Sequence, residues 1–430
     1  KKGNLKLLVS TFKKSQIKAF VPRSLILNGK DALGAHVTED GLCPLCITWE
    51  EGKIKLIEPI CKKSELPLKL LLPRFVETHA HIDKAFTWND FPNLLGTYNC
   101  ALQQNLKEHK NRNIQDISQR TSKALEMALR NGIRTIRTHV DSFGLVGIQS
   151  WDKLIDIRSS WRDLIDLQLV ALVPIEYWGT SEGLFLASHV ANSGGLLGGV
   201  LQPPFNNRVA FQSLFNLIKT ANNIGCGVDL HIDETQNEPA IGLNLLLKVL
   251  EKISNNVPIT CSHSSSMGLL PKNNIRSLAE KLFVHKINVI ALPLTNAWLL
   301  GRNGMDTPVM RPLAPIYQLQ KAGVTVAVGS DNVKDPWFPL GNFDPISLIA
   351  LCMPLAQLAP WQRLGLSPFT TSAAKVLDLK WDGTFFKGSP ANWILIDAKN
   401  WVDALSLNAK REVIVNGIPL LELPANYSSN

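Results

Sequence analysis

The stretch RFVETHAHIDKAF, residues 74–86, ends a short apolar run with two histidines, His79 and His81. Successive side chains of an extended strand point to opposite faces, so residues two positions apart share a face. Both imidazoles can therefore reach one point in space, which suits a metal ion. Two histidines by themselves are weak evidence, because such pairs are more often ordinary surface or hydrogen-bonded residues.

From residue 74 onward, short β-branched runs alternate with longer amphipathic stretches, which is typical of βα units and a parallel sheet. In residues 213–224 and 242–253, Leu and Ile recur at three- and four-residue spacing, which predicts helices. Eight such units over about 300 residues predict an α/β fold of the (β/α)8, or TIM barrel, type. The predicted strands cover residues 74–81, 133–141, 167–174, 198–203, 227–233, 258–263, 288–294 and 324–331.

Both ends of the chain show turn-punctuated β runs without intervening helices. We predict that residues 1–73 and 383–430 form one small β-sandwich domain, and that residues 74–382 form the catalytic barrel. Cys43 and Cys46 form a C-x-x-C motif, but no second pair follows at zinc-finger spacing. The segment is typical of two strands around a Glu-Gly-Lys turn, so we interpret both cysteines as packed thiols.

The composition is that of an ordinary globular protein, with 430 residues, 45% hydrophobic and 19% charged. The net charge of +9 comes from scattered Lys and Arg without an aromatic-interleaved basic stripe, which argues against nucleic acid as a partner. Seven cysteines, an odd number, do not form a disulfide framework. No apolar run reaches the roughly 18 residues of a membrane span. These features predict a soluble cytoplasmic protein with no membrane partner.

Polar residues follow several of the predicted strands, where the loops of a barrel build the active site. Four of the nine histidines lie at the carboxyl ends of three strands, and Asp331 ends the eighth strand. Three neutral imidazoles and one carboxylate form a ligand set for a divalent transition metal, zinc or iron(II), with a position left for water. The predicted ligands are His79, His81, His231 and Asp331.

The number of metals and the proton chemistry follow from the other strand ends. The fourth strand ends in LQPPF, residues 201–205, and offers no lysine for a bridging carbamate, so we expect one metal. The metal would lower the pKa of water from about 15.7 towards about 7. His263 and Asp331 would orient that water, and Glu234 would act as general acid and base. Taken alone, Glu234 would more often be a loop residue that caps the next helix.

Six longer motifs resemble the amidohydrolase superfamily and, within it, the cytosine deaminase branch. They are FVETHAHIDKAF, GIRTIRTHVD, HIDETQNE, TCSHSSSM, LPLTNAWLLGR and GSDNVKDPWFPLGN. The resemblance covers the barrel and both flanking segments. It implies the same metal ligands, a proton-shuttling role for Glu234, a water-supporting role for His263, and a place for Trp337 in the wall of the substrate pocket.

Two pocket positions depart from the cytosine deaminase pattern. The family has Phe-Pro-Gln-Glu-Gly after the third strand, whereas this chain has VPIEYWG, which places Ile175 at the glutamine and adds Trp178. Asn332 follows Asp331 where the family often has a second Asp. An isoleucine side chain cannot hydrogen-bond a base, and a pocket without such bonds discriminates less. We therefore expect this chain to share the family's type of reaction more closely than the family's substrate, cytosine.

We expect hydrolytic deamination of an amino-substituted, cytosine-like nitrogen heterocycle, with water as the second substrate and ammonia as a product. One alternative is hydrolysis of a cyclic amide or an N-alkylated triazine-like ring, and another is a non-catalytic ligand-binding homologue. His139 and Asp141, at the end of the second strand, either line the pocket or serve as structural hydrogen-bonding residues. The sequence leaves the oligomeric state open, a homo-oligomer included.

Overall fold

The computed structural model describes residues 15–406 and 409–422. These residues divide into two compact units. One contains Val76–Ala359 and Ser367–Leu379, and the other contains the segments towards both chain ends together with Pro360–Leu366. The predicted domain boundaries stay a prediction, and their residues 1–14, 407–408 and 423–430 lie outside the described part.

The larger unit contains eight parallel strands in the order β12-β11-β10-β9-β8-β7-β6-β5. A bridge between Ala80 and Asp331 links the first strand to the segment after the last, so the barrel is nearly closed. This arrangement confirms the predicted TIM barrel. The strands are β5 (Phe75–Ala80), β6 (Ile133–Asp141), β7 (Asp166–Leu172), β8 (Leu196–Leu201), β9 (Val228–Ile232), β10 (Ile259–His263), β11 (Asn288–Ala291) and β12 (Val326–Val328).

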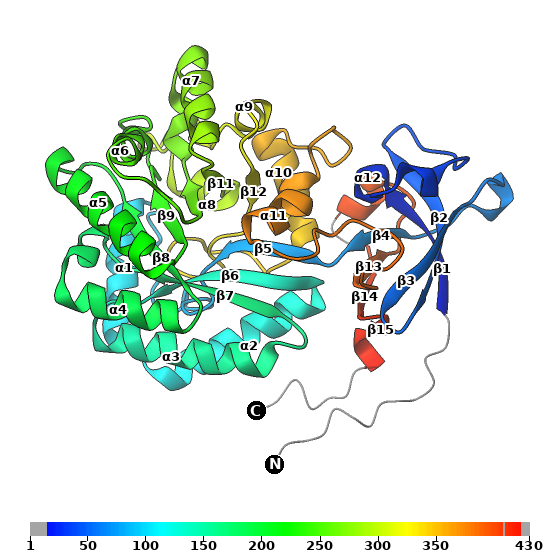
Figure 1. Ribbon diagram of the computed structural model, residues 1–430, viewed down its shortest axis with the longest axis horizontal. Helices are drawn as coiled ribbons and strands as arrows, with labels where there is room; N and C mark the ends of the chain where they lie inside the picture. The colour runs from blue at the N-terminus through cyan, green and yellow to red at the C-terminus, as the bar shows by residue number, and fades with distance from the viewer. Residues whose placement is uncertain (1–14, 407–408, 423–430) are drawn as a thin grey trace. The chain divides into compact units, whose positions relative to one another are not determined.

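Helices lie around the outside of these strands (Figure 1). Their ends carry the expected caps: Asn113 accepts from the backbone of Asp116 at the start of α2, and Gly225 ends α5 with φ +66°. The helices of this unit are α1 (Tyr98–Asn111), α2 (Ile114–Arg130), α3 (Gly144–Trp161), α4 (Ser181–Asn192), α5 (Asn207–Ile224), α6 (Ile241–Leu250), α7 (Lys272–Val284), α8 (Pro293–Leu299), α9 (Ile316–Lys321), α10 (Pro345–Ala356) and α11 (Thr371–Val376).

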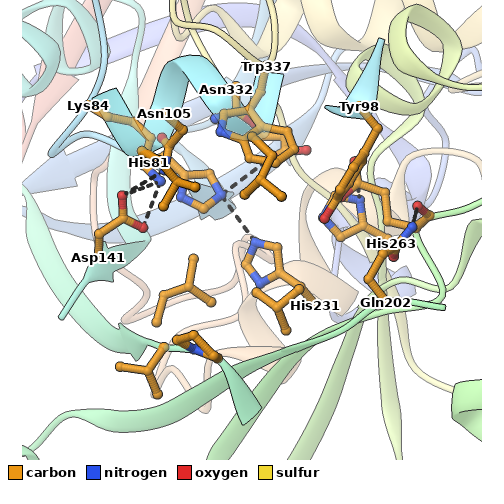
Figure 2. A pocket seen from close by; sticks show the side chains of 18 of the residues that line it. His81, Lys84, Tyr98, Asn105, Asp141, Gln202, His231, His263, Asn332 and Trp337 are labelled. Carbon is orange, nitrogen blue, oxygen red and sulfur yellow. Dashed lines mark hydrogen bonds and ion pairs between the residues drawn. The ribbon is translucent and has the colours of Figure 1, made fainter. Parts of the chain in front are cut away.

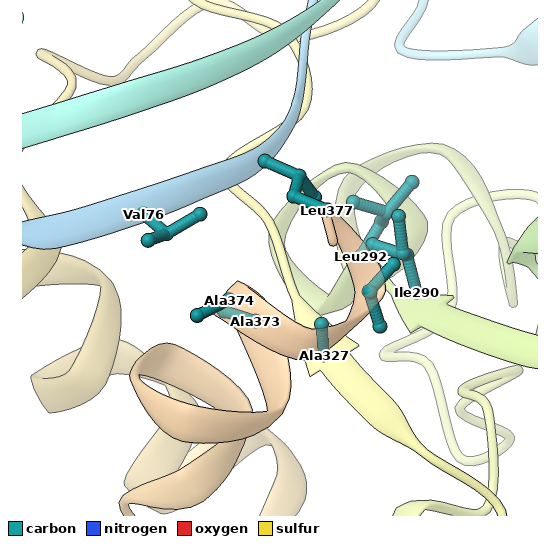
Figure 3. Packing of buried hydrophobic residues seen from close by; sticks show 8 residues of the cluster. Val76, Ile290, Leu292, Ala327, Ala373, Ala374 and Leu377 are labelled. Atoms are coloured by element: carbon teal, nitrogen blue, oxygen red, sulfur yellow. The ribbon is translucent and has the colours of Figure 1, made fainter. Parts of the chain in front are cut away.

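A small apolar cluster packs α11 against β5, β11 and β12 (Figure 3). Beside it, Arg137 of β6 and Gln168 of β7 donate hydrogen bonds to the carbonyls of Val376 and Leu377. The close packing of such a core makes the strand positions well defined. The cluster consists of Val76, Ile290, Leu292, Ala327, Ala373, Ala374, Val376 and Leu377.

The smaller unit contains one seven-stranded sheet in the order β15-β14-β13-β4-β1-β2-β3. Strands from both chain ends meet where β4 pairs with β13, which confirms the predicted small β domain formed by the two terminal segments. β1 and β4 are parallel and the other neighbours are antiparallel. The strands are β1 (Ser15–Pro22), β2 (Leu42–Glu50), β3 (Lys53–Pro59), β4 (Leu70–Pro73), β13 (Trp393–Ile396), β14 (Arg411–Val415) and β15 (Ile418–Pro419), and a short helix, α12 (Trp401–Leu405), follows β13.

Cys43 and Cys46 both lie on β2, and both are buried free thiols, as predicted. The turn at Glu51 and Gly52 joins β2 to β3. Among the helices of the described ranges, none combines the length and the apolar character that crossing a membrane requires.

Candidate active site

The four predicted metal ligands come together at the carboxyl ends of the barrel strands. His81 Nε2 lies 3.3 Å from His79 Nε2 and 3.2 Å from His231 Nε2. Asp331 Oδ1 lies 3.3 Å from His81 Nε2 and 3.5 Å from His79 Nε2. All four side chains are buried. His79 on β5 and His231 on β9, with His81 just after β5 and Asp331 after β12, therefore direct their donor atoms to one point.

These distances fit a metal ion. Ligand atoms about 2.1 Å from a tetrahedral metal lie about 3.4 Å from one another. In addition, neither buried oxygen of Asp331 has a hydrogen bond of good geometry to any described residue. A buried carboxylate is costly unless it is paired or coordinates a metal. The donor set and its spacing therefore suit one divalent ion.

A chain of hydrogen bonds behind His79 fixes its ring. Ser262 Oγ lies 2.9 Å from His79 Nδ1 and donates to Asp229 Oδ1 at 2.8 Å. Arg137 Nη1 in turn donates to Asp229 Oδ2 at 2.9 Å. Such outer hydrogen bonds orient metal-ligating histidines. Sequence reasoning missed these three residues, although Asp229 lies two positions before His231 and so on the same strand face.

Glu77 connects the first and last strands beneath the ligands. Its carboxyl group accepts hydrogen bonds from the backbone of His79 at 3.0 Å and from Ser330 at 3.0 and 3.2 Å. Burial raises the pKa of Glu77 to about 7. Gly329 allows this close approach, because a Cβ there would lie 2.9 Å from Glu77 Oε1. The carboxyl of Glu77 thus sets the spacing between His79 and Asp331.

Glu234 and His263 form the second part of the site. His263 Nδ1 lies 3.5 Å from Glu234 Oε1, and Asn296 Nδ2 donates to His263 Nδ1 at 3.1 Å. Burial raises the pKa of Glu234, and the nearby charge of Asp331 raises it further. Burial lowers the pKa of His263 to about 4. A carboxyl group that can hold a proton therefore lies beside a neutral imidazole, next to Asp331.

A backbone turn after β9 moves Glu234 towards the pocket. Asp233 has φ +56°, which ends the strand alternation that would point residue 234 away from His231. The Asp233 carboxylate accepts from the backbone of Gly242 and Leu243, each at 2.8 Å, and so caps α6. The capping role weighed for Glu234 in the sequence is therefore performed by the preceding residue.

The side chains of His81, His231, Glu234, His263 and Asp331 lie at a cavity of about 480 Å³ (Figure 2). Lys84, Asn105 and Asp141 are on one side of it, and Tyr98 and Gln202 are on the other (Figure 2). Its lining consists of His81, Lys84, Tyr98, Leu102, Asn105, Leu106, Asp141, Phe143, Leu172, Val173, Pro174, Val200, Gln202, His231, Glu234, His263, Asp331, Asn332 and Trp337.

Two of the four predicted substrate-pocket residues, Asn332 and Trp337, line this cavity. Ile175 and Trp178 do not. Both are buried in the short helix η5 (Ile175–Gly179), and Trp178 Nε1 donates to the carbonyl of Gly198 on β8 at 2.7 Å. Their large side chains pack behind the wall, so Val173 and Pro174 face the cavity instead.

His139 and Asp141 have different positions, which the sequence could not distinguish. Asp141 lines the cavity, whereas His139 is buried behind His79 with ring centroids 3.9 Å apart. Neither ring nitrogen of His139 has a hydrogen-bond partner within residues 15–406 and 409–422. The stacked imidazole therefore supports His79 by packing.

A family model described as the amidohydrolase family matches residues 200–420. The chain belongs to this family. Members depend on metals, and the buried His and Asp clusters of this chain could hold one. The amidohydrolase is thus a hydrolase that acts on carbon–nitrogen bonds, and the predicted cytosine deaminase-like branch is confirmed.

Curated relatives match most of the amidohydrolase. It is 29% identical to a pterin deaminase of Rhizobium rhizogenes (strain K84 / ATCC BAA-868), over 88% of each chain. It is 25% identical to N-isopropylammelide isopropyl amidohydrolase of Pseudomonas sp. (strain ADP), over 83% of this chain and 87% of the relative. Among solved structures, 5-methylcytosine deaminase from Klebsiella pneumoniae has a TM-score of 0.80 at 24% identity and covers 94% of this chain and 98% of its own, which supports the fold.

Proposed function

We propose that this amidohydrolase is a metal-dependent hydrolytic deaminase of an amino-substituted nitrogen heterocycle and that it releases ammonia. The observation that carries the proposal is the position of Glu234 Oε1, 3.5 Å from His263 Nδ1 at the cavity that also holds the ligand cluster. The pterin deaminase and 5-methylcytosine deaminase relatives act on rings of this kind. The proposed substrates are such a ring and water.

We propose that His79, His81, His231 and Asp331 hold one zinc or iron(II) ion. Such an ion would supply Lewis acidity that brings the pKa of water near about 7. In the proposed reaction, Glu234 takes a proton from the attacking water and gives it to the ring nitrogen. His263 accepts from Asn296 through Nδ1, so its Nε2 carries a proton and donates to the attacking oxygen. The new carbon–oxygen bond forms, Glu234 takes the second proton from that oxygen and gives it to the amine, and the carbon–nitrogen bond then breaks to release ammonia.

Glu234→Gln tests the proton transfer. The amide cannot shuttle protons, so we expect at least a ~100-fold loss of kcat with the metal content unchanged. Ammonia release should be measured over amino-pyrimidines, purines, pteridines and triazines with zinc- and with iron-loaded protein. Glu238→Gln, on an exposed position of the same loop, is the matched control and should keep full activity. Turnover retained by Glu234→Gln would remove this residue from the role.

A second candidate function is hydrolysis of an N-alkylated triazine-like ring. The apolar part of the cavity lining, Leu102, Leu106 and Phe143 included, would accommodate an alkyl group, and the isopropyl amidohydrolase relative favours this reaction. The amine that is released separates the two functions. Release of an alkylamine at a higher kcat/KM than ammonia would favour the second candidate.

A further inference from the structure

Tyr98, the first residue of α1, lines the cavity and has no part in the proton chemistry proposed above. Its hydroxyl group makes no hydrogen bond with any described residue, and it is not among the side-chain atoms that are buried without a partner. The phenol oxygen is therefore open to the cavity, on the same side as His263 (Figure 2). A hydroxyl group can both donate and accept hydrogen bonds.

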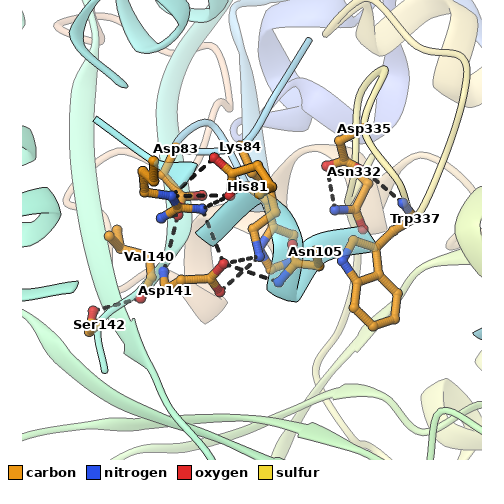
Figure 4. A network of polar contacts seen from close by, with 12 residues as sticks. His81, Asp83, Lys84, Asn105, Val140, Asp141, Ser142, Asn332, Asp335 and Trp337 are labelled. Carbon is orange, nitrogen blue, oxygen red and sulfur yellow. Dashed lines mark hydrogen bonds and ion pairs between the residues drawn. The ribbon is translucent and has the colours of Figure 1, made fainter. Parts of the chain in front are cut away.

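The direction of the Tyr98 ring is fixed by its neighbours. It packs edge-on against Trp337, with ring centroids 5.0 Å apart and planes at 71°. The buried Asp335 holds that tryptophan, because it accepts from the Trp337 backbone at 2.9 Å and from Asn332 Nδ2 at 2.7 Å (Figure 4). The side chain of Thr97 caps α1 immediately before Tyr98. The free hydroxyl therefore belongs to a well-packed side chain.

Glu234 is held in the same cavity at both of its ends. Gln202 Nε2 donates to its backbone carbonyl, and Asn296 Nδ2 donates to its Oε1 at 3.5 Å. Partial burial raises the pKa of Tyr98, and the charges of Glu234 and Asp331 raise it further, so the phenol stays protonated and lies near both carboxyl groups. No hydrogen bond joins the phenol to Glu234, so a substrate group can lie between them.

The leaving amine is the substrate group that most needs such a neighbour. When Glu234 gives it a proton, the nitrogen gains positive charge and carries three N–H groups. In an enclosed cavity, each N–H group without an acceptor costs free energy. A hydrogen bond from a charged donor is about twice as strong as one between neutral groups. A phenol oxygen beside the amine would therefore stabilise the protonated amine more than the neutral one.

We propose that Tyr98 is a further catalytic residue, which binds the exocyclic amine as it leaves the ring. An N–H group of the amine donates to Tyr98 Oη while Glu234 protonates the nitrogen. The carbon–nitrogen bond then breaks with its electron pair on nitrogen, and ammonia departs. This inference rests on the proposed function and adds a residue at the amine end of the site.

Tyr98→Phe tests this role, because it removes only the hydroxyl group and keeps the ring that packs on Trp337. With 2-amino-4-oxopteridine, kcat/KM should fall at least ~10-fold, and the fall in kcat should exceed the rise in KM, because the lost bond is strongest when the amine is charged. With 2-methoxy-4-oxopteridine, whose leaving oxygen carries no hydrogen, kcat/KM should change by less than about threefold. Should another amino-pyrimidine, purine, pteridine or triazine be deaminated faster, that ring and its methoxy analogue replace the pair.

Tyr177→Phe is the matched control, since Tyr177 does not line the cavity and loses the same atom. It should leave kcat/KM for both rings unchanged. The melting temperature and the metal content of Tyr98→Phe should also equal those of the wild-type protein, because the hydroxyl has no partner among the described residues.

A binding measurement decides the question if the wild-type protein does not hydrolyse the methoxy ring. The dissociation constant of 2-amino-4-oxopteridine for metal-loaded Glu234→Gln protein should rise at least ~3-fold when Tyr98→Phe is added, because an N–H group of the bound amine loses its acceptor. The dissociation constant of 2-methyl-4-oxopteridine, in which a methyl group replaces the amine, should stay the same.

The outcomes separate the inference from the function on which it rests. A smaller loss than expected on the amino ring, or a similar change on the amino ring and its methoxy or methyl analogue, would overturn the role of Tyr98 and leave the deaminase proposal standing. Metal-loaded wild-type protein that released no ammonia from any amino ring would overturn the proposed function, and the role of Tyr98 with it.

Discussion

Two groups of polar residues in the barrel, one around His79 and one around Asp141, differ in how their hydrogen bonds are completed. Around His79, the chain Ser262, Asp229 and Arg137 satisfies the outer nitrogen and leaves the inner donor atoms to converge on one point. Around Asp141, the charges are balanced, and one buried acceptor, Asn105 Oδ1, has no partner among the described residues. The first arrangement suits a metal ion, and the second is a set of ion pairs without net charge. The residues around His79 would therefore support the proposed chemistry, whereas those around Asp141 hold one wall of the cavity together.

Removal of a proposed metal ligand should have the largest effect. His231→Ala takes away one of the converging imidazoles, so metal content should fall below half of the wild-type stoichiometry and ammonia release by more than ~1,000-fold. Metal analysis of the purified protein and a continuous ammonia assay measure both quantities. His36→Ala, which removes an exposed histidine, should change neither. Full metal content in His231→Ala would remove this residue from the ligand set.

Loss of the outer hydrogen bond to His79 should have an intermediate effect. Ser262→Ala leaves every ligand in place but frees the ring of His79, so the metal dissociation constant should rise about 10- to 100-fold. Competition with a chelator of known affinity measures this change. Ser160→Ala, at an exposed position of α3, should leave the affinity unchanged. An unchanged affinity in Ser262→Ala would show that packing against His139 is enough to orient the ring.

The smallest effect is expected behind the cavity wall. Ile175→Val removes one buried methylene group, so the free energy of unfolding should fall by about 0.5–1.5 kcal/mol. Since Ile175 does not line the cavity, the ratio of kcat/KM values for two ring substrates should stay the same. Urea unfolding and paired kinetics measure these two quantities. A change in the substrate ratio would return Ile175 to the role expected from its place in the sequence.

The sequence predicted the barrel well because each strand and helix has its own local pattern. The second predicted strand, 133–141, coincides with β6. The last one, 324–331, is longer than β12, which covers only Val326–Val328, and Asp331, with φ +63°, lies in the turn beyond it. The His and Asp residues could be located for a similar reason, since each follows a strand and parallel strands end at one edge of the barrel.

The sequence by itself determined the fold class, the family and the candidate ligands, because these depend on local periodicity and on residue types at strand ends. Only the tertiary structure decided which side chains face the cavity. Ile175 and Trp178 turn away from it, while Lys84 and Asn105, from a loop and a helix, meet Asp141 at its wall. Such contacts join residues far apart in the chain, and their direction depends on packing and charge pairing that no local pattern records.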